Sequence, residues 1–209
     1  MLLEADNIGF QYGKDRWVLR NVAVKVAAGD ILGFAGPSGY GKTTFARILA
    51  GYEQPHTGQV LLNGLPLPKS GYNPVQLIFQ HPEKAVNPRW RMKKTLSEGC
   101  EPDNGIMEAL GIKPAWLNRW PNELSGGELQ RFCVARALNS RTRFLIADEM
   151  TTMLDAITQA QLWRVVLNFS RDNNMGVLII SHDARLMTRL CRQIINLADI
   201  NNPASSIAN

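Results

Sequence analysis

The chain has 209 residues, 45% of them hydrophobic and 20% charged, with 17 Gly and 11 Pro. This composition is typical of one globular domain with a subdomain, and it excludes collagen-like, disordered and coiled-coil proteins. The net charge of +5 permits anionic partners such as nucleotides, nucleic acid or lipid headgroups, but it selects none of them.

The first eighty residues predict a β layer followed by a strand, a loop and a helix. Alternating and apolar runs predict short strands at residues 2–5, 8–12, 22–26, 60–62 and 75–79. A turn is expected at 13–15. Ile31–Ala35 is typical of a strand buried on both faces, and a Gly-rich loop separates it from a helix predicted at 43–50.

The texture changes from His81 to Asn122, where scattered Pro, basic residues and a helical stretch around 106–110 predict a small helical insert. After it, strands and helices alternate again, with expected elements at 127–139 (helix), 144–147 (strand), 158–173 (helix), 176–181 (strand) and 184–191 (helix). Repeated strand and helix units predict an α/β fold with a parallel sheet covered on both faces. The residues from Asp199 onward are expected to form a frayed tail.

The cysteines and the apolar runs bear on location. Cys100, Cys133 and Cys191 are odd in number and widely spaced, which favours a reducing compartment over a disulfide framework or a zinc site. No apolar run approaches the roughly 18 to 20 residues needed to cross a bilayer. Because the first residues contain no secretory signal, we expect a cytosolic location.

One motif between the buried strand and the helix predicts phosphate binding. The pattern G-x-x-x-x-G-K-[ST] is matched by Gly36, Pro37, Ser38, Gly39, Tyr40, Gly41, Lys42 and Thr43, and Thr44 follows it. Its glycines let backbone amides face phosphate oxygens at a helix start. Lys42 would reach the β- and γ-phosphates, and Thr43 would place its hydroxyl on Mg²⁺. A Gly-rich turn that merely carries a Lys is the alternative, and the flanking strand and helix argue against it.

Two acids follow the apolar run Phe144–Ala147. Carboxylates at the carboxyl end of a parallel strand project into the crevice where ligands bind. Asp148 therefore suits Mg²⁺ coordination, and Glu149 suits a general base that takes a proton from attacking water. Without the phosphate loop, a strand followed by an acidic helix cap would be an equal interpretation.

A second anion site is predicted at Leu124–Arg131, where Ser125, Gly126, Gly127 and Glu128 begin a helix with a hydroxyl and two glycines. Alone, this segment would be a helix cap. Together with the phosphate loop and the acidic strand end, the chain resembles the ATP-binding cassette (ABC) ATPases, whose signature loop reads LSGGQ where this chain has LSGGE.

The resemblance implies a P-loop NTPase fold with an antiparallel β subdomain and a small helical insert, using ATP and Mg²⁺. It implies one cassette over 1–209, divided into a nucleotide-binding core at 1–80 and 140–198, a helical subdomain with the signature at 81–139, and a flexible tail at 199–209.

The same resemblance implies roles for other residues. Tyr12 would stack on adenine, with Trp17 as the alternative stacking residue or Tyr12 as a core aromatic. Gln80 would sense Mg²⁺ and the attacking water, His182 would contact the γ-phosphate, and Asp155 would communicate across a dimer. Mg²⁺ would then involve Thr43, Gln80 and Asp148, and catalysis would involve Glu149, His182, Gln80 and Lys42.

Three residues depart from the family pattern: Tyr40 in place of a small residue, Glu128 in place of Gln, and Met150 in place of Pro. None removes a phosphate ligand or the base. His81-Pro82 and Asn87-Pro88-Arg89 resemble importer ATPases for dipeptides, oligopeptides and nickel, and the stretch from Asp148 to Asp155 also resembles members serving metal-chelate or opine uptake.

The resemblance also implies partners. A second ABC ATPase subunit, identical or related, would complete the ATP site head to tail. Two membrane permeases would dock on His81–Lys94 with Trp90 as an anchor, at the cytoplasmic face of the membrane, and an extracytoplasmic solute-binding protein would act indirectly. A solvated basic loop near lipid is the alternative for this segment. The rival functions are a soluble cassette protein acting on nucleic acid or ribosomes and a nonhydrolysing regulatory cassette.

Overall fold

The computed structural model describes residues 1–13, 16–101 and 103–201. A five-stranded parallel sheet has the order β6-β7-β8-β3-β9. Its strands are β3 (Ile31–Ala35), β6 (Val75–Ile78), β7 (Phe144–Asp148), β8 (Gly176–Ile180) and β9 (Gln193–Asn196). All residues of β7 and β8 are buried, as expected for strands in the middle of a sheet covered on both faces.

The two faces of this sheet pack against different hydrophobic cores. In β7, Phe144 and Ile146 belong to one core, whereas Leu145 and Ala147 belong to the other. This alternation follows from the pleat of a strand, in which successive side chains point to opposite faces. The parallel sheet therefore joins two layers of the protein.

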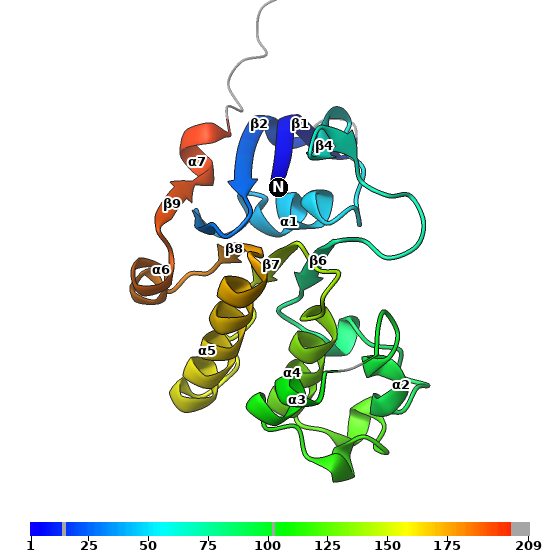
Figure 1. Cartoon of the computed structure of the whole chain (residues 1–209). Coiled ribbons are helices and arrows are strands. Elements are labelled where there is room, and N and C mark those ends of the chain that lie inside the picture. The colour runs from blue at the N-terminus through cyan, green and yellow to red at the C-terminus, as the bar shows by residue number, and fades with distance from the viewer. Residues whose placement is uncertain (14–15, 102, 202–209) are drawn as a thin grey trace, which may run out of the picture.

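The first core lies between the parallel sheet and a four-stranded antiparallel sheet of order β2-β1-β4-β5. The strands of this second sheet are β1 (Leu2–Tyr12), β2 (Arg16–Ala27), β4 (Thr57–Leu62) and β5 (Leu65–Pro66). Helix α1 (Lys42–Leu49) lies between the two sheets (Figure 1). The rings of Phe34 and Phe45 stack there with centroids 5.0 Å apart, which ties α1 to β3.

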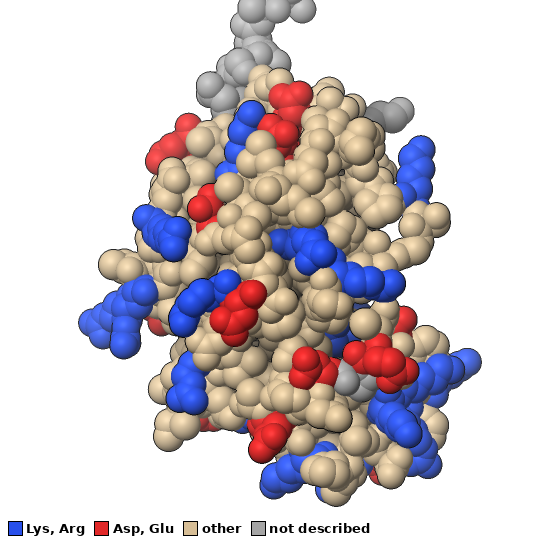
Figure 2. Space-filling model, viewed as in Figure 1, with Lys and Arg blue, Asp and Glu red and all other residues tan. Residues whose placement is uncertain are grey.

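The other face of the parallel sheet is covered by helices. The longer helices there are α4 (Gly126–Ala137) and α5 (Ala156–Asn173), with α6 (Ala184–Leu190) toward the β9 edge. The predicted insert contains α2 (Met92–Leu96), α3 (Asn104–Ala109) and the 3-10 helices η1 (Pro82–Lys84), η2 (Pro114–Trp116) and η3 (Pro121–Glu123). Figure 1 shows α2, α3 and α4 gathered on the side of the sheet away from α1. Figure 2 shows Lys and Arg side chains over the region of α2.

Two expectations were wrong. The segments 2–5 and 8–12 form the single strand β1, in which Asn7 with a φ of 50° accompanies a register shift between Ala5 and Ile8. The frayed tail predicted from Asp199 is wrong for its first residues, because Asp199 lies in α7 (Leu197–Ile200) and the buried Asn201 donates to Val18 O at 2.8 Å. The rest of the predicted tail, 202–209, and most of the predicted turn at 13–15 lie outside the described residues.

Candidate active site

The predicted phosphate loop connects β3 to α1, as the strand-loop-helix pattern requires. Gly36, Gly39 and Gly41 have φ values of 150°, 80° and 94°. At Gly41, the residue before α1, a Cβ atom would lie 2.6 Å from Cγ1 of Val18. Glycine is therefore required at this position both for its backbone conformation and for space.

Lys42 at the start of α1 is held by its own loop. The side chain is buried, and its Nζ donates to Gly36 O at 2.7 Å and to Pro37 O at 2.9 Å. Burial lowers the pKa of Lys42, while Glu149 and Asp148 act in the opposite direction. The ammonium group is thus positioned at the loop by carbonyl oxygens, next to two carboxylates.

Asp148 at the end of β7 offers an oxygen ligand for a cation. The residue is 3% exposed, and its Oδ1 has no hydrogen-bond partner among the described residues. Burial raises the pKa of Asp148, and a hydrogen bond from the Thr43 hydroxyl lowers it. A buried carboxylate oxygen without a partner, beside a hydroxyl at the phosphate loop, fits Mg²⁺, which prefers oxygen ligands and usually keeps several waters.

Glu149 is held between two other predicted site residues. Gln80 Nε2 donates to Glu149 Oε2 at 3.0 Å, and His182 Nε2 lies 2.6 Å from Glu149 Oε1. Glu149 has a φ of 50°, and its backbone N donates to Ile180 O at 2.9 Å. Residues other than glycine rarely adopt this left-handed conformation, because it costs free energy. The hydrogen bonds around Glu149 offset this cost and hold the residue in place.

A cavity of about 420 Å³ brings many of the predicted residues together. Its lining comprises Tyr12, Arg16, Val18, Ser38, Gly39, Gly41, Lys42, Thr43, Thr44, Glu149 and His182. Gln80 reaches this set through Glu149, whereas Gly36, Pro37, Tyr40 and Asp148 are not part of the lining. The sequence interpretation missed Arg16; its basic side chain near Tyr12 was the only available signal.

The two candidates for the stacking aromatic occupy different places. Tyr12 is 54% exposed, and its hydroxyl lies 3.1 Å from Thr44 Oγ1, directly after the phosphate loop. Trp17 is partly buried, lies edge-on to His56 at 6.3 Å and does not line the cavity. The position of Tyr12 suits stacking on a base bound beside the phosphates.

The predicted signature residues lie at the start of α4 and form a capping box. Glu128 N donates to Ser125 Oγ at 3.3 Å, and Ser125 N donates to Glu128 Oε2 at 2.8 Å. The bond from the Ser125 backbone is the main cause that lowers the pKa of Glu128. Glu128, which replaces the family's usual Gln, is therefore the second member of the capping box. The N-cap itself is Ser125, the first residue of the predicted anion site.

The signature residues open onto a different cavity, of about 540 Å³, which Ser125, Gly127 and Glu128 line together with Met153 and Asp155. This cavity shares no lining residue with the cavity at the phosphate loop. Asp155 caps α5 by accepting from Ile157 N and Thr158 N at 3.0 and 2.9 Å. The chain therefore places the two predicted phosphate-binding elements at two separate sites.

A family model described as ABC transporter matches residues 19–152, which is more than half of the chain. The chain belongs to the ABC transporter family. The match includes Lys42, Gln80, the signature and Glu149, whereas Tyr12, Asp155 and His182 lie outside it. The chain is accordingly an ATP-hydrolysing transporter subunit, and the predicted family assignment is confirmed.

Named relatives include nickel import proteins. The chain is 33% identical over 201 residues to the nickel import ATP-binding protein NikE of Rhodospirillum rubrum, with 86% of this chain and 72% of that protein covered. It is 31% identical over 211 residues to the nickel import system ATP-binding protein NikE of Staphylococcus aureus, with 95% and 87% covered.

Solved structures of ABC proteins share the fold. One is a dimeric post-hydrolysis state of an ATP-binding cassette bound to ADP and Pi, with a TM-score of 0.78, 21% identity and 93% of both chains covered. Another is an ATP-bound bacterial Atm1-family ABC exporter, with a TM-score of 0.76 and 21% identity, covering 94% of this chain and 37% of that one. The predicted ABC ATPase fold is confirmed.

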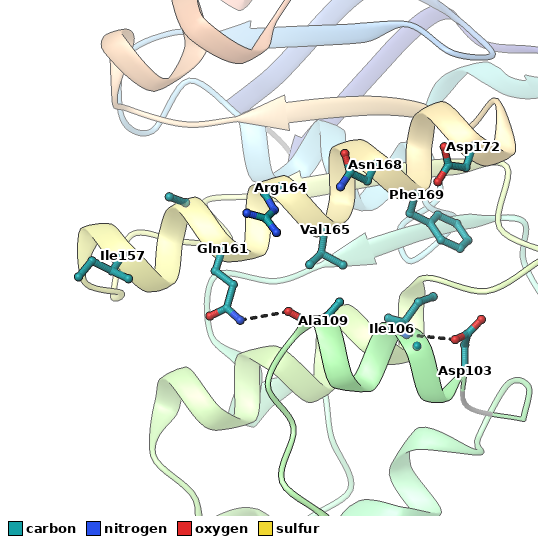
Figure 3. Close-up of a pocket in the computed structure, with 12 residues that line it drawn as sticks. Asp103, Ile106, Ala109, Ile157, Gln161, Arg164, Val165, Asn168, Phe169 and Asp172 are labelled. Atoms are coloured by element: carbon teal, nitrogen blue, oxygen red, sulfur yellow. Dashed lines mark hydrogen bonds between the residues drawn. The ribbon is translucent and has the colours of Figure 1, made fainter.

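A further cavity shares no lining residue with the cavity at the phosphate loop, which we call the nucleotide cavity from here on. A cavity of about 710 Å³ lies between α3 and α5, where Figure 3 shows Ile106, Val165 and Phe169 between the two helices and Gln161 bonded to Ala109. None of the predicted site residues lines it. In the part of the chain that the structure describes, no group of three or more His, Cys, Asp and Glu could hold a metal ion, and no helix could span a membrane.

Proposed function

We propose that this chain is the ATP-binding and ATP-hydrolysing subunit of an importer for nickel, metal chelates or peptides. The observation that carries the proposal is the arrangement of Glu149 between Gln80 and His182, in contact with the cavity that Lys42 and Thr43 line. The names of the relatives support import and nickel. Peptides and metal chelates rest on the sequence resemblance.

The residues of the nucleotide cavity account for hydrolysis. The amides of the phosphate loop and of the start of α1 would hold the ATP phosphates, with the ammonium group of Lys42 against their negative charge. Glu149 would take a proton from a water whose oxygen attacks the γ-phosphorus, and ADP would leave with the bridging oxygen. Gln80 and His182, which contact the two oxygens of Glu149, would orient the base and the water.

Mg²⁺ fits the buried, unpartnered Oδ1 of Asp148 and the hydroxyl of Thr43. When bound with ATP, it would neutralise part of the charge on the phosphates. Gln80 would offer Mg²⁺ its amide oxygen, since its amide nitrogen donates to Glu149.

A second cassette would complete the ATP site. The support is that Ser125 and Gly127 line a cavity of their own and share no lining residue with the phosphate loop. Head-to-tail pairing would place these donors of one subunit on the ATP of the other, and Asp155, which lines the signature cavity, would lie at that interface. The second subunit is an identical or a related chain.

Two permeases would dock on His81–Lys94. Within this segment Lys94 Nζ lies 4.2 Å from the ring centroid of Trp90, and the guanidinium of Arg91 lies 4.9 Å from that of Trp120. None of Lys84, Arg89, Arg91, Lys93 and Lys94 forms an ion pair with a carboxylate of the described residues. Exposed cations beside aromatic rings suit an acidic and apolar partner surface at the cytoplasmic face of the membrane.

Co-purification followed by uptake measurements tests this proposal. The chain should purify with membrane permeases and a second cassette. Vesicles that carry the assembly with its cassettes facing the lumen should accumulate nickel, a metal chelate or a peptide only when the lumen contains ATP. Trp90→Ala should reduce assembly and transport while the ATPase activity of isolated cassettes persists. Bound RNA or ribosomes in place of permeases would favour the soluble cassette function instead.

A further inference from the structure

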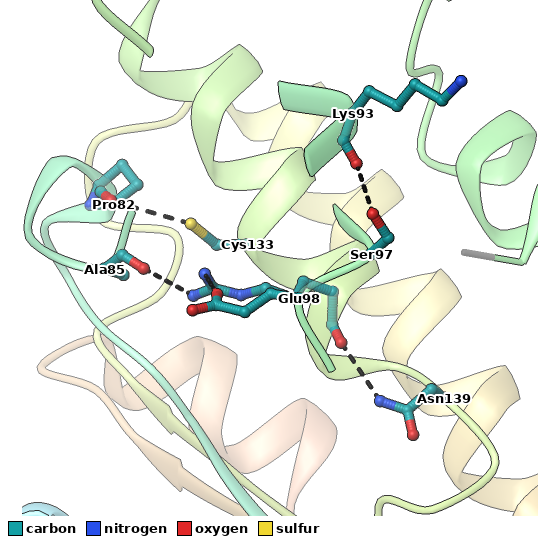
Figure 4. Close-up of polar contacts among 8 residues, drawn as sticks. Pro82, Ala85, Lys93, Ser97, Glu98, Cys133 and Asn139 are labelled. Carbon is teal, nitrogen blue, oxygen red and sulfur yellow. Dashed lines mark hydrogen bonds and ion pairs between the residues drawn. The ribbon is translucent and has the colours of Figure 1, made fainter. Parts of the chain in front are cut away.

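Three side chains of α4 bind the chain segment that follows β6. Gln130 Nε2 donates to Phe79 O at 3.3 Å, Cys133 Sγ to Pro82 O at 3.9 Å, and Arg136 Nη2 to Ala85 O at 2.8 Å. Donors and acceptors both advance by three residues, so the segment follows one face of the helix. Figure 4 shows the contact of Cys133 with Pro82 and the bond that Ala85 accepts. We call these contacts the α4 ladder.

Burial protects the ladder from water. Gln130 and Cys133 are 2% and 3% exposed, so their hydrogen bonds have no competing solvent. Burial raises the pKa of Cys133 to about 11, which keeps its thiol protonated as a weak donor. Arg136 also pairs with Glu98 at 2.8 Å, which fixes the end of the ladder.

The ladder connects the proposed catalytic residues of this chain to its signature, which would act on the ATP of the partner subunit. Its first acceptor, Phe79 O, belongs to the residue directly before Gln80, whose amide donates to Glu149. Its donors lie on the helix that begins with the signature glycines. A shift of α4 would therefore pull on the backbone at Gln80, because Gln130 lies only about one turn from the start of this helix.

The buried Oε1 of Gln130 has no hydrogen-bond partner among the described residues. A buried acceptor without a partner destabilises the folded chain, because it has given up its hydrogen bonds to water. On folding, the side-chain amide of Gln130 thus gains one hydrogen bond, to Phe79 O, while its oxygen loses its hydrogen bonds to water. This imbalance indicates that apolar packing alone does not explain the residue at this position.

We propose that Gln130 is a positioning residue that holds the backbone before Gln80 so that the Gln80 amide reaches Glu149, and that α4 thereby couples the signature to the catalytic base. The inference rests on the proposed role of Gln80 in hydrolysis. Gln130 touches neither ATP nor water in this account, and it acts only through Gln80.

The test uses Gln130→Met in the assembled transporter. Methionine keeps the length and the burial but cannot donate to Phe79 O. A lost hydrogen bond corresponds to about a twofold to tenfold fall in kcat, with the KM for ATP changed by less than about twofold. Asn173→Leu is the matched control, because the Asn173 amide also donates to a backbone carbonyl, Phe169 O at 3.0 Å, but at the end of α5, outside the cavities of the phosphate loop and the signature. It should leave kcat unchanged.

A double-mutant cycle separates positioning from a structural role. If Gln130 acts through Gln80, Gln130→Met should lower kcat in the native background and have no further effect in Gln80→Ala. Equal falls in both backgrounds would overturn the positioning role while leaving the proposed function intact. An unchanged kcat in Gln80→Ala itself would instead refute the role of Gln80, and the coupling with it.

A second variant covers the case in which Gln130→Met does not fold. Arg136→Lys keeps a cation near Glu98 but replaces the planar group that bonds both Glu98 and Ala85 O. Its fall in kcat should be smaller and should also vanish in the Gln80→Ala background. A fall that persists there would overturn the ladder as a coupling device.

Discussion

The phosphate loop and the signature loop both begin a helix with glycines, yet the structure prepares them differently. At the phosphate loop, Lys42 is held by two carbonyls and Glu149 by two side chains. At the signature, the hydroxyl and the backbone nitrogen of Ser125 both bond to Glu128 in the capping box. At the phosphate loop the proposed catalytic side chains are held by other residues of the same chain, whereas Ser125 and Gly126 of the signature are exposed.

This difference suits the proposal that the two regions serve one reaction in a pair of cassettes. The catalytic base must be positioned within about 0.5 Å, which requires fixed neighbours in the same chain. The signature needs only a rigid helix start that a second molecule can reach, and a capping box supplies it. A single cassette should therefore bind ATP well and hydrolyse it poorly.

Among the variants considered, Glu149→Gln should have the largest effect, and this effect should be on the rate of ATP hydrolysis. The amide keeps the shape of the acid but cannot take a proton from water, so hydrolysis should fall by about 10² to 10⁴-fold. ATP affinity should persist, because Lys42 and Asp148 are unchanged. Phosphate release from the assembled transporter and ATP titration measure the two quantities. Hydrolysis at the native rate would remove Glu149 from the role of base.

Lys42→Ala should act on binding. It removes an ammonium group that would face two phosphates of ATP, and hydrogen bonds to charged groups contribute about 1.5 to 3 kcal/mol each, so ATP affinity should fall by about 100-fold or more. The bonds to Gly36 O and Pro37 O are lost as well, which should loosen the loop. Calorimetric titration measures the affinity, and near-native binding of MgATP would contradict the assignment.

Tyr12→Ala sharpens the description of the same cavity. If Tyr12 stacks on adenine, affinity should fall by about 1 to 3 kcal/mol, the size of base stacking on aromatic residues in single-stranded nucleic acid complexes. Trp17→Ala is the matched comparison and should have a smaller effect, since Trp17 does not line the cavity. The reverse order of the two effects would reassign the stacking residue.

Glu128→Gln should have the smallest effect, at the signature. The pKa of Glu128 is lowered in the folded state, so its carboxylate contributes stability above the usual pKa of 4.5, and this is lost as pH falls through the lowered value. Since Glu128 is partly exposed to solvent, which screens its charge, the loss should be less than about 1 kcal/mol. Thermal unfolding measured at a series of pH values from 7 to 3 should show this loss of stability in the native chain but not in Glu128→Gln. Identical pH profiles would contradict the capping role.

The sequence predicted the parts of the molecule that local pattern determines. The phosphate loop lies between a strand and a helix as expected, and Asp148 and Glu149 end a buried strand. Helix starts were accurate to within about two residues, because caps such as Asp155 and Asp183 have side-chain preferences of their own.

Contacts between distant segments were beyond prediction from the sequence. Strand β9 and helix α2 are too short to carry a periodic pattern. The contact of Gln80 with Glu149 joins residues 69 positions apart, and the bonds of Asn201 to the β2 region join residues more than 180 apart. The first pair depends on the pairing of β6 with β7 and the second on the packing of α7 against β2, and neither depends on local spacing.

The central claim is that a second cassette completes the site, and ATP-dependent association tests it most directly. The mass of Glu149→Gln should be measured by light scattering with and without MgATP, alone and mixed with a cassette subunit that co-purifies with the native chain. A doubling of mass that requires MgATP, and that is lost when Ser125→Arg is added, is the predicted result. ATP-bound protein of unchanged mass in both samples would contradict the account.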